Sequence, residues 1–233
     1  GRAILHEARG VVDRAAGLLA TARSLSSGLE ARVALAVDVM FPRPALLDVL
    51  RRFQAEFPSV ELALHSEALG AVAALVAGGT CDLGIGTPII RRPSGLDGLP
   101  LGFVEMVGVV SAGHALALAE VPSQLAMTEA VQIVLTDRSP LTEGLDQAVL
   151  PGRHWRVADL GTKRDLILEG FGFGGLPLWM AQADLDGGRL VEIQPEGWTG
   201  RRPDYSLSAF WRRAEPLGVA GTWLLGELGL CCR

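Results

Sequence analysis

The feature that most constrains the fold is an alternation of short apolar strands with amphipathic helices. The run "ARVALAV" at 31–37 alternates like a strand, and a helix-like stretch at 44–57 carries apolar residues at steps of four, three and four. Strand-like runs follow at 58–66 and 81–87, with a helical stretch at 67–79 between them. Three strands with two intervening helices are typical of a parallel sheet. We therefore expect an α/β fold.

The alternation is interrupted once and then starts again. Residues 95–117 contain two extended runs with no helix between them. The expected elements after this point are helices at 122–127, 139–150, 161–170, 177–188 and 216–230, and strands at 130–137, 154–159, 171–177, 189–193 and 203–213. The restart predicts two α/β lobes rather than one continuous sheet.

The first 25 residues have the pattern of one long helix, roughly 37 Å in length. Its apolar residues follow a heptad spacing. They are Ile4, Ala8, Val11, Ala15, Leu18, Ala22 and Leu25. Such a seam either packs on its own domain or pairs with a second copy, and the regular alanines favour pairing because they allow close approach of a partner backbone. Ser26, Ser27 and Gly28 then predict the end of the helix and a short linker.

Composition excludes several classes of function. The net charge of −5 and the pI near 5.4 argue against this chain being the part that grips nucleic acid, because phosphate binding needs a basic face. The longest uncharged stretches, such as 106–119, are shorter than the roughly 20 residues of a membrane span. An odd number of cysteines without a spacing pattern, and no visible signal peptide, predict a cytoplasmic location.

Motifs for catalysis or metal binding are missing. The sequence "GFGFGG" at 170–175 has the spacing of a dinucleotide-binding loop, but it follows a predicted helix and precedes a predicted strand, the reverse of what that site needs. We interpret it as a turn with Gly170 at the helix C-cap. The four histidines are scattered, and no nucleophile–base pair or metal-ligand spacing is present. We expect no enzyme activity, no cofactor and no metal.

Polar residues instead gather in the loops that follow the predicted strands. In open α/β sheets, ligands bind outside the carboxyl ends of the strands. The loops concerned lie at 38–41, 65–69, 86–87, 136–139 and 159–162. For each single residue, helix capping is the alternative interpretation.

A series of segments resembles the LysR-type transcriptional regulators. The segments are "LLDVLRRFQAEFPSVELAL", "LVAGGTCDLGIG", "SAGHALA", "ILEGFGFGGLP" and "GGRLVEI", in that family's order and spacing. The resemblance implies a linker helix followed by a two-lobed, periplasmic-binding-protein-like (type 2) effector domain, with a winged helix-turn-helix domain that would precede residue 1. It assigns residues 1–28 to the linker and dimerisation helix, 29–104 and 206–233 to lobe I, and 105–205 to lobe II. Two crossing strands would join the lobes near Val104–Glu105 and Ser206–Leu207.

The resemblance also carries over the family's effector contacts, residue by residue. They fall on Asp38, Met40, Phe41, Glu67, Leu69, Thr87, Thr136, Asp137, Arg138, Ser139, Asp159, Gly161 and Thr162. Many relatives have a Ser or Thr just after the first strand, where this chain has Val39, Met40 and Phe41. We therefore expect an effector with an apolar part, and the several carboxylates leave a cationic or amine-bearing effector open.

The function implied is the effector-sensing and oligomerisation region of a bacterial LysR-type regulator. Its expected partners are a small molecule bound between the lobes and a second copy of itself, as a dimer or tetramer. It would reach DNA only through the N-terminal domain that this sequence does not include. Two alternatives remain open at this point: a solute-binding protein of the same two-lobed fold, and an enzyme built on it.

Overall fold

The computed structural model describes residues 29–88, 93–118, 121–136, 139, 141, 148–194 and 204–231. The predicted helix at 1–28 with its heptad seam lies outside these residues, as do Asp137, Arg138 and most of the helix predicted at 139–150. The strands are β1 Arg32–Asp38, β2 Glu61–Glu67, β3 Leu83–Gly86, β4 Leu96–Ser111, β5 Val131–Leu135, β6 Arg153–Val157, β7 Phe173–Pro177, β8 Leu190–Glu192 and β9 Asp204–Arg212. The helices are α2 Arg43–Glu56, α3 Gly70–Ala77, α4 Gln124–Glu129, α5 Leu160–Leu168, α6 Leu178–Asp186 and α7 Val219–Leu230, with a 3₁₀ helix at Ala115–Leu118.

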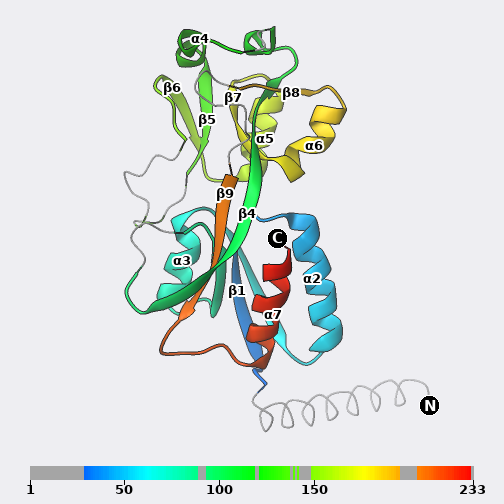
Figure 1. Cartoon of the computed structure of the whole chain (residues 1–233), viewed down its shortest axis with the longest axis vertical. Helices are drawn as coiled ribbons and strands as arrows, with labels where there is room; N and C mark the ends of the chain where they lie inside the picture. Colours follow the sequence, from blue (N-terminus) through cyan, green and yellow to red (C-terminus); the bar gives the residue numbers. More distant parts are fainter. Residues whose placement is uncertain are drawn as a thin grey trace, which may run out of the picture.

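The described strands form one sheet in the order β2-β1-β3-β9-β4-β7-β5-β6, with β8 also paired to β4. The expectation that the restart excludes a continuous sheet is therefore wrong, because β4 pairs with strands on both sides of it. Strands β1, β2 and β3 run parallel and, with α2, α3 and α7, form what we call the first half of the molecule. Strands β5 to β8 with α4, α5 and α6 form the second half. Figure 1 shows the first half below and the second half above, connected by β4 and β9. The α/β fold predicted from the alternation is confirmed.

Strand β4 corrects one expectation. The two extended runs predicted within 95–117 are a single strand of 16 residues. Its first part, through Glu105, pairs with β9, and its last part pairs with β7 and β8. The register of the pairing with β9 shifts between Pro100 and Gly102, so the strand continues through a local irregularity.

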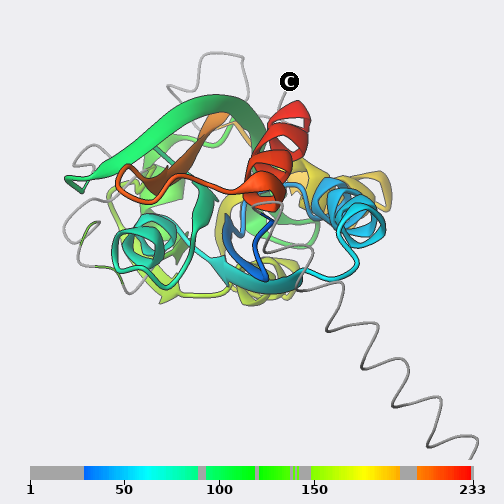
Figure 2. The ribbon, with the colours of Figure 1, turned by 90° about the horizontal axis from the view of Figure 1, so that it is seen from below.

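Both faces of the first half's sheet are covered by helices, which explains why β1 is apolar throughout. Val33, Leu35 and Val37 pack in the core cluster that includes α2 and α7, whereas Ala34 and Ala36 pack with residues of α3. The view from below shows α3 on the opposite side of β1 from α2 and α7 (Figure 2). Small residues on the α3 side let that helix lie close to the sheet.

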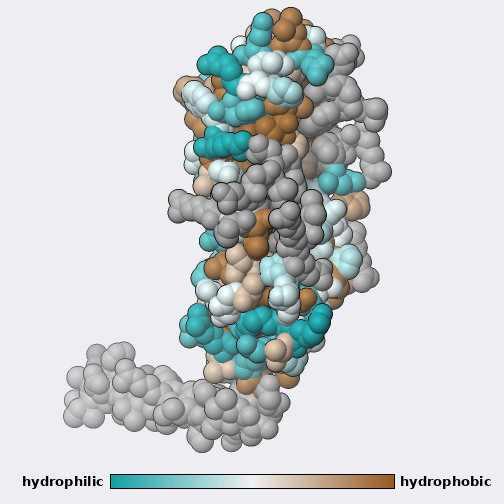
Figure 3. All heavy atoms as spheres, turned by 90° about the vertical axis from the view of Figure 1, so that its left-hand side faces the viewer, coloured by the Kyte–Doolittle hydropathy of each residue, from teal (hydrophilic) through white to brown (hydrophobic). Residues whose placement is uncertain are grey.

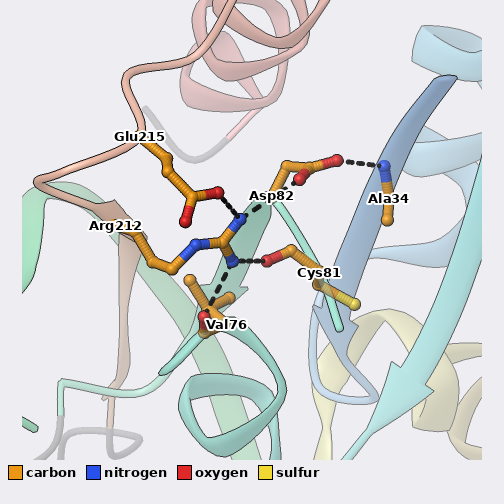
Figure 4. A network of polar contacts seen from close by, with 6 residues as sticks. All are labelled: Ala34, Val76, Cys81, Asp82, Arg212 and Glu215. Atoms are coloured by element: carbon orange, nitrogen blue, oxygen red, sulfur yellow. Dashed lines mark hydrogen bonds and ion pairs between the residues drawn. The ribbon is translucent and has the colours of Figure 1, made fainter. Parts of the chain in front are cut away.

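Arg212, at the end of β9, fastens the far end of α3 to the sheet (Figure 4). Its Nη1 donates to the carbonyl oxygens of Val76 and Cys81, at 2.9 and 2.6 Å. Its Nη2 reaches Asp82 Oδ1 at 3.4 Å and Glu215 Oε2 at 2.7 Å, and Asp82 Oδ2 accepts from the amide of Ala34 at 2.8 Å. The start of α3 carries one of the predicted site loops, and this network holds the other end of the helix in place.

The "GFGFGG" segment begins with a turn, as predicted, and its end from Phe173 belongs to β7. Helix α5 ends just before Gly170, which has φ +80° and donates its amide to the carbonyl of Ile167 at 3.0 Å. Such a left-handed residue after a helix is a common C-terminal stop that favours glycine. Strand β7 then begins at Phe173, so the glycines do not open a helix toward a phosphate.

The surface of the second half carries exposed apolar side chains. On the face drawn in Figure 3, hydrophobic surface gathers in the upper half, while a band of hydrophilic residues crosses the lower half. Trp155 of the edge strand β6 is 43% exposed, and its ring centroid lies 5.4 Å from that of Phe171, which is 50% exposed. None of the helices in the described ranges is both long and apolar enough to cross a membrane.

Candidate functional site

The loops after β1 and β2 meet at the carboxylate of Asp38. Because the two strands are parallel and Asp38 pairs with Glu67, both loops emerge at the same edge of the sheet. Asp38 is 2% exposed, and its Oδ1 accepts from the Met40 amide at 2.9 Å. Its Oδ2 accepts from the Leu69 amide at 3.1 Å and from the Tyr205 hydroxyl at 3.0 Å. Asp38 therefore links both predicted site loops to β9.

Met40 and Phe41 are buried rather than exposed at the site. Met40 is 5% exposed in the core cluster of the second half, and its carbonyl oxygen accepts from Trp179 Nε1, on α6, at 2.9 Å. Phe41 is 2% exposed and belongs to the core of the first half. The loop after β1 thus crosses from one core to the other within two residues, so it ties the halves together.

Two further predicted residues of the first half lie beside this loop. Leu69 precedes α3 with φ +51° and packs against the second half's core cluster. Thr87 follows β3, which pairs in parallel with β1, and is 8% exposed. The structure therefore brings together the predicted residues of the first half at one edge of its sheet.

Asp159 and Thr162 form the N-terminal cap of α5. Asp159 Oδ1 accepts from the Thr162 amide at 2.6 Å, and a Cβ on Gly161 would lie 3.2 Å from the same oxygen. The backbone and side-chain hydrogen bonds of Thr162 lower the pKa of Asp159, with a smaller contribution from the positive charge of Arg43. This is the capping role named above as the alternative interpretation. Because Arg43 begins α2 in the first half, its charge acts across the boundary between the halves.

Of the remaining predicted residues, the structure describes Thr136 and Ser139. Thr136 follows β5, and its amide donates to the carbonyl of Val157 at 2.8 Å. Ser139 Oγ accepts from the Leu141 amide at 3.1 Å. Asp137 and Arg138 lie outside the described residues.

Apolar residues of both halves close the boundary. Val39, Met40 and Leu69 from the first half share one hydrophobic cluster with Leu160 and Leu178, which begin α5 and α6. In Figure 1 the start of α2 lies directly below α5 and α6. Met40 and Leu69, two predicted contacts of the first half, therefore pack in one cluster with Leu160, which directly follows the predicted contact Asp159.

Sequence reasoning missed Tyr205 and Trp179. Tyr205 lies near the start of β9 and Trp179 on the first turn of α6. Neither lies in a loop that follows a parallel strand, and only such loops were considered as site loops. The one available signal was that Tyr205 is the single tyrosine of the chain, since a buried tyrosine hydroxyl usually finds a partner.

Lys163 is a buried cation next to the cap of α5. It is 6% exposed, and burial lowers its pKa from 10.5 to about 8. Its ammonium group has no hydrogen bond or ion pair to the part of the chain that the structure describes. The buried carboxylate of Asp184, in contrast, is paired with Arg164 and Arg189.

Among the described residues, the structure contains neither a reactive thiol nor a group of side chains suited to bind a metal ion. Cys81 and Cys231 are free, and burial raises the pKa of Cys81 to about 11, which keeps it in the unreactive thiol form. Within the described ranges, no group of three or more His, Cys, Asp or Glu side chains is arranged to hold a metal ion.

The sequence model of the LysR substrate binding domain matches residues 26–229. The chain belongs to this family. It is 24% identical over 231 residues to the probable HTH-type transcriptional regulator YhaJ of Escherichia coli K12, covering 98% of this chain and 76% of that protein. It is 28% identical over 243 residues to the uncharacterized HTH-type transcriptional regulator YeeY of the same strain, covering 98% and 79%.

Solved structures share the fold. The regulatory domain of MetR, a LysR family regulator from Neisseria meningitidis, superposes with a TM-score of 0.63 at 20% identity, covering 86% of this chain and 92% of that one. The effector binding domain of QuiR in complex with shikimate superposes with a TM-score of 0.68 at 14% identity, covering 86% and 96%. The predicted periplasmic-binding-protein-like type 2 fold is confirmed.

These comparisons establish the kind of protein. The chain is the effector-binding region of a LysR-type transcriptional regulator. The alternative of a solute-binding protein is not favoured.

Proposed function

We propose that this region senses a small molecule held between the loops of the two halves. The halves correspond to lobe I at 29–104 and 206–233 and lobe II at 105–205. The observation that carries the proposal is the meeting of Val39, Met40 and Leu69 with Leu160 in one apolar cluster at that boundary. The contacts are the predicted set, with Asp38 and Phe41 acting through their hold on the loop after β1 rather than by touching the effector. The region works in the cytoplasm, without catalysis, and controls DNA binding by the N-terminal domain.

The chemistry of the boundary indicates an effector with an apolar part and a small number of polar groups. The apolar cluster supplies contact area, and Thr87, Thr136 and Thr162 supply hydroxyl groups. The shikimate complex of QuiR supports small-molecule binding by this fold. Because a ligand shifts a conformational equilibrium only by binding one state better than the other, the effector must prefer one arrangement of the halves.

A thermal-shift screen tests this proposal. The panel consists of aromatic and aliphatic acids, amino acids and amines, and each hit is analysed by mass spectrometry. A ligand at 100 times its dissociation constant should stabilise the protein by about 2.7 kcal/mol. Recovery of the ligand unchanged supports sensing, whereas its consumption would favour the enzyme alternative.

Matched variants locate the binding site. Thr87→Val is expected to weaken the shift by a hit at least several-fold, because it removes a hydroxyl beside the loops. Thr222→Val makes the same change at an exposed position of α7, away from the loops, and should leave the shift intact. If the ligand shifts the melting temperature of both variants equally, the ligand does not bind beside Thr87.

Self-association is proposed to depend on the heptad seam of the N-terminal stretch. Leu18→Glu places a charge on the seam and should lower the mass measured by light scattering, whereas Arg14→Glu, off the seam, should not. An unchanged mass for Leu18→Glu would count against a pairing role for this segment.

A further inference from the structure

A buried carboxylate joins three segments that are far apart in the sequence. Asp38 ends β1, Leu69 precedes α3 and Tyr205 lies near the start of β9. The carboxylate accepts from the amides of Met40 and Leu69 and from the Tyr205 hydroxyl, at 2.9, 3.1 and 3.0 Å. Both oxygens of Asp38 are engaged by protein donors and the residue is 2% exposed, so its role is to hold the loops rather than to contact an effector.

The backbone at Leu69 needs this support. Its φ of +51° and ψ of −125° are unfavourable for a residue with a Cβ, and such conformations persist only where surrounding contacts impose them. The hydrogen bond from its amide to Asp38 is one such contact. If the Asp38 carboxylate moves away from the Leu69 amide, the backbone of the loop after β2 should therefore change conformation.

Tyr205 connects this carboxylate to both halves. It pairs with Val104 where β4 and β9 run between the halves, and its ring packs against the core clusters of both. A change in the relative placement of the halves would move the hydroxyl with respect to Asp38. The second link, from Trp179 Nε1 to the Met40 carbonyl, reaches the same loop from α6.

We propose that Tyr205 is a positioning residue for effector binding, because its hydrogen bond to Asp38 sets the conformation of both loops according to the placement of the halves. This inference rests on the proposed function, in which those loops contact the effector. It adds that effector binding at the two loops is coupled to movement of one half relative to the other. The coupling passes through the hydrogen bond between the Tyr205 hydroxyl and the Asp38 carboxylate.

Amide hydrogen exchange on the whole chain without ligand tests the contact itself. Tyr205→Phe keeps the ring and removes the hydroxyl, and should speed exchange of the Leu69 and Met40 amides about tenfold, the effect expected for one hydrogen bond to a charged group. Ser206→Ala removes a hydroxyl from the exposed neighbour on the same strand and should change nothing. In the Asp38→Asn background, Tyr205→Phe should add little further effect. Unchanged exchange at Leu69, or equal acceleration at core amides such as that of Ile133, would overturn the proposal.

The same panel of acids, amino acids and amines then tests the link to binding. For compounds that shift wild type, Tyr205→Phe should weaken affinity about tenfold and Ser206→Ala should not. If both variants bind as wild type does, the inference fails and the proposed function stands. If no compound shifts wild type, the proposed function fails for this panel, and the exchange experiment still decides whether Tyr205 positions the loops.

Discussion

Replacing Lys163 with methionine should stabilise the protein by about 3 kcal/mol at pH 7. The pKa of this lysine is about 8 in the folded protein against 10.5 ordinarily, because burial disfavours the charged form. The gap of about 2.5 pH units between the two pKa values corresponds to about 3 kcal/mol. Methionine fills a similar volume without a charge.

The two pKa values also determine how the stabilisation by Lys163→Met changes with pH. Since the folded pKa lies below the unfolded one, the unfolded state binds more protons between pH 8 and 10.5. The penalty of the buried charge is full below pH 8 and disappears as the pH rises to 10.5. The stabilisation by Lys163→Met should therefore be large at pH 7 and shrink toward zero above pH 10.

Urea denaturation of both proteins at pH 7 and pH 10 measures this difference. Burial raises the pKa of both Cys81 and Cys231, but both thiols are present in both proteins, so their contribution cancels in the comparison. Arg153→Met removes one exposed positive charge and serves as the control, with an expected change within about 0.5 kcal/mol. An equal gain at both pH values would contradict the assignment of the effect to the buried charge.

Gly172→Ala should destabilise the protein by about 3 kcal/mol or more. A Cβ on this buried glycine would lie 2.0 Å from the carbonyl oxygen of Val131 and 2.9 Å from its carbonyl carbon. Both are backbone atoms at the start of β5, so no side-chain rotation can relieve the overlap. The chain between α5 and β7 or the strand β5 must move.

Gly226→Ala is the matched control. Gly226 lies inside α7, is exposed, and a Cβ there would meet nothing within 4 Å. Alanine in a helix interior is favoured over glycine by up to about 1 kcal/mol, so this variant should gain stability. The midpoints of urea unfolding compare the two, and a Gly172→Ala variant as stable as wild type would show that β5 moves freely at Val131.

Most helices and strands were predictable because the spacing of their apolar residues matches either a helix or a strand. The continuous apolar run of β1 and the steps of α2 are local patterns, and both elements form where they were predicted. Strand β4 was predicted as two runs, and only its pairing with β9, which continues past the register shift between Pro100 and Gly102, makes it one strand. The turn at Gly170 was predictable because its left-handed backbone depends on its own residue type.

The site was predictable only in outline. Parallel strands place their following loops at one edge, so Asp38, Leu69 and Thr87 were expected to lie together, and they do. The role of each residue did not follow from its type. Asp159 caps α5, Met40 is buried in the second half's core, and Asp38 holds neighbouring amides.

The sequence by itself determined the family, the α/β class and the edge of the sheet at which the candidate loops gather. Each of these depends on periodicity and on the order of segments along the chain. The tertiary structure alone decided which half buries Met40, that Tyr205 reaches Asp38 across 167 positions, and that Lys163 is buried without a partner in the described chain. These outcomes depend on packing between segments distant in sequence, where burial and hydrogen bonding are decided by geometry that no local pattern encodes.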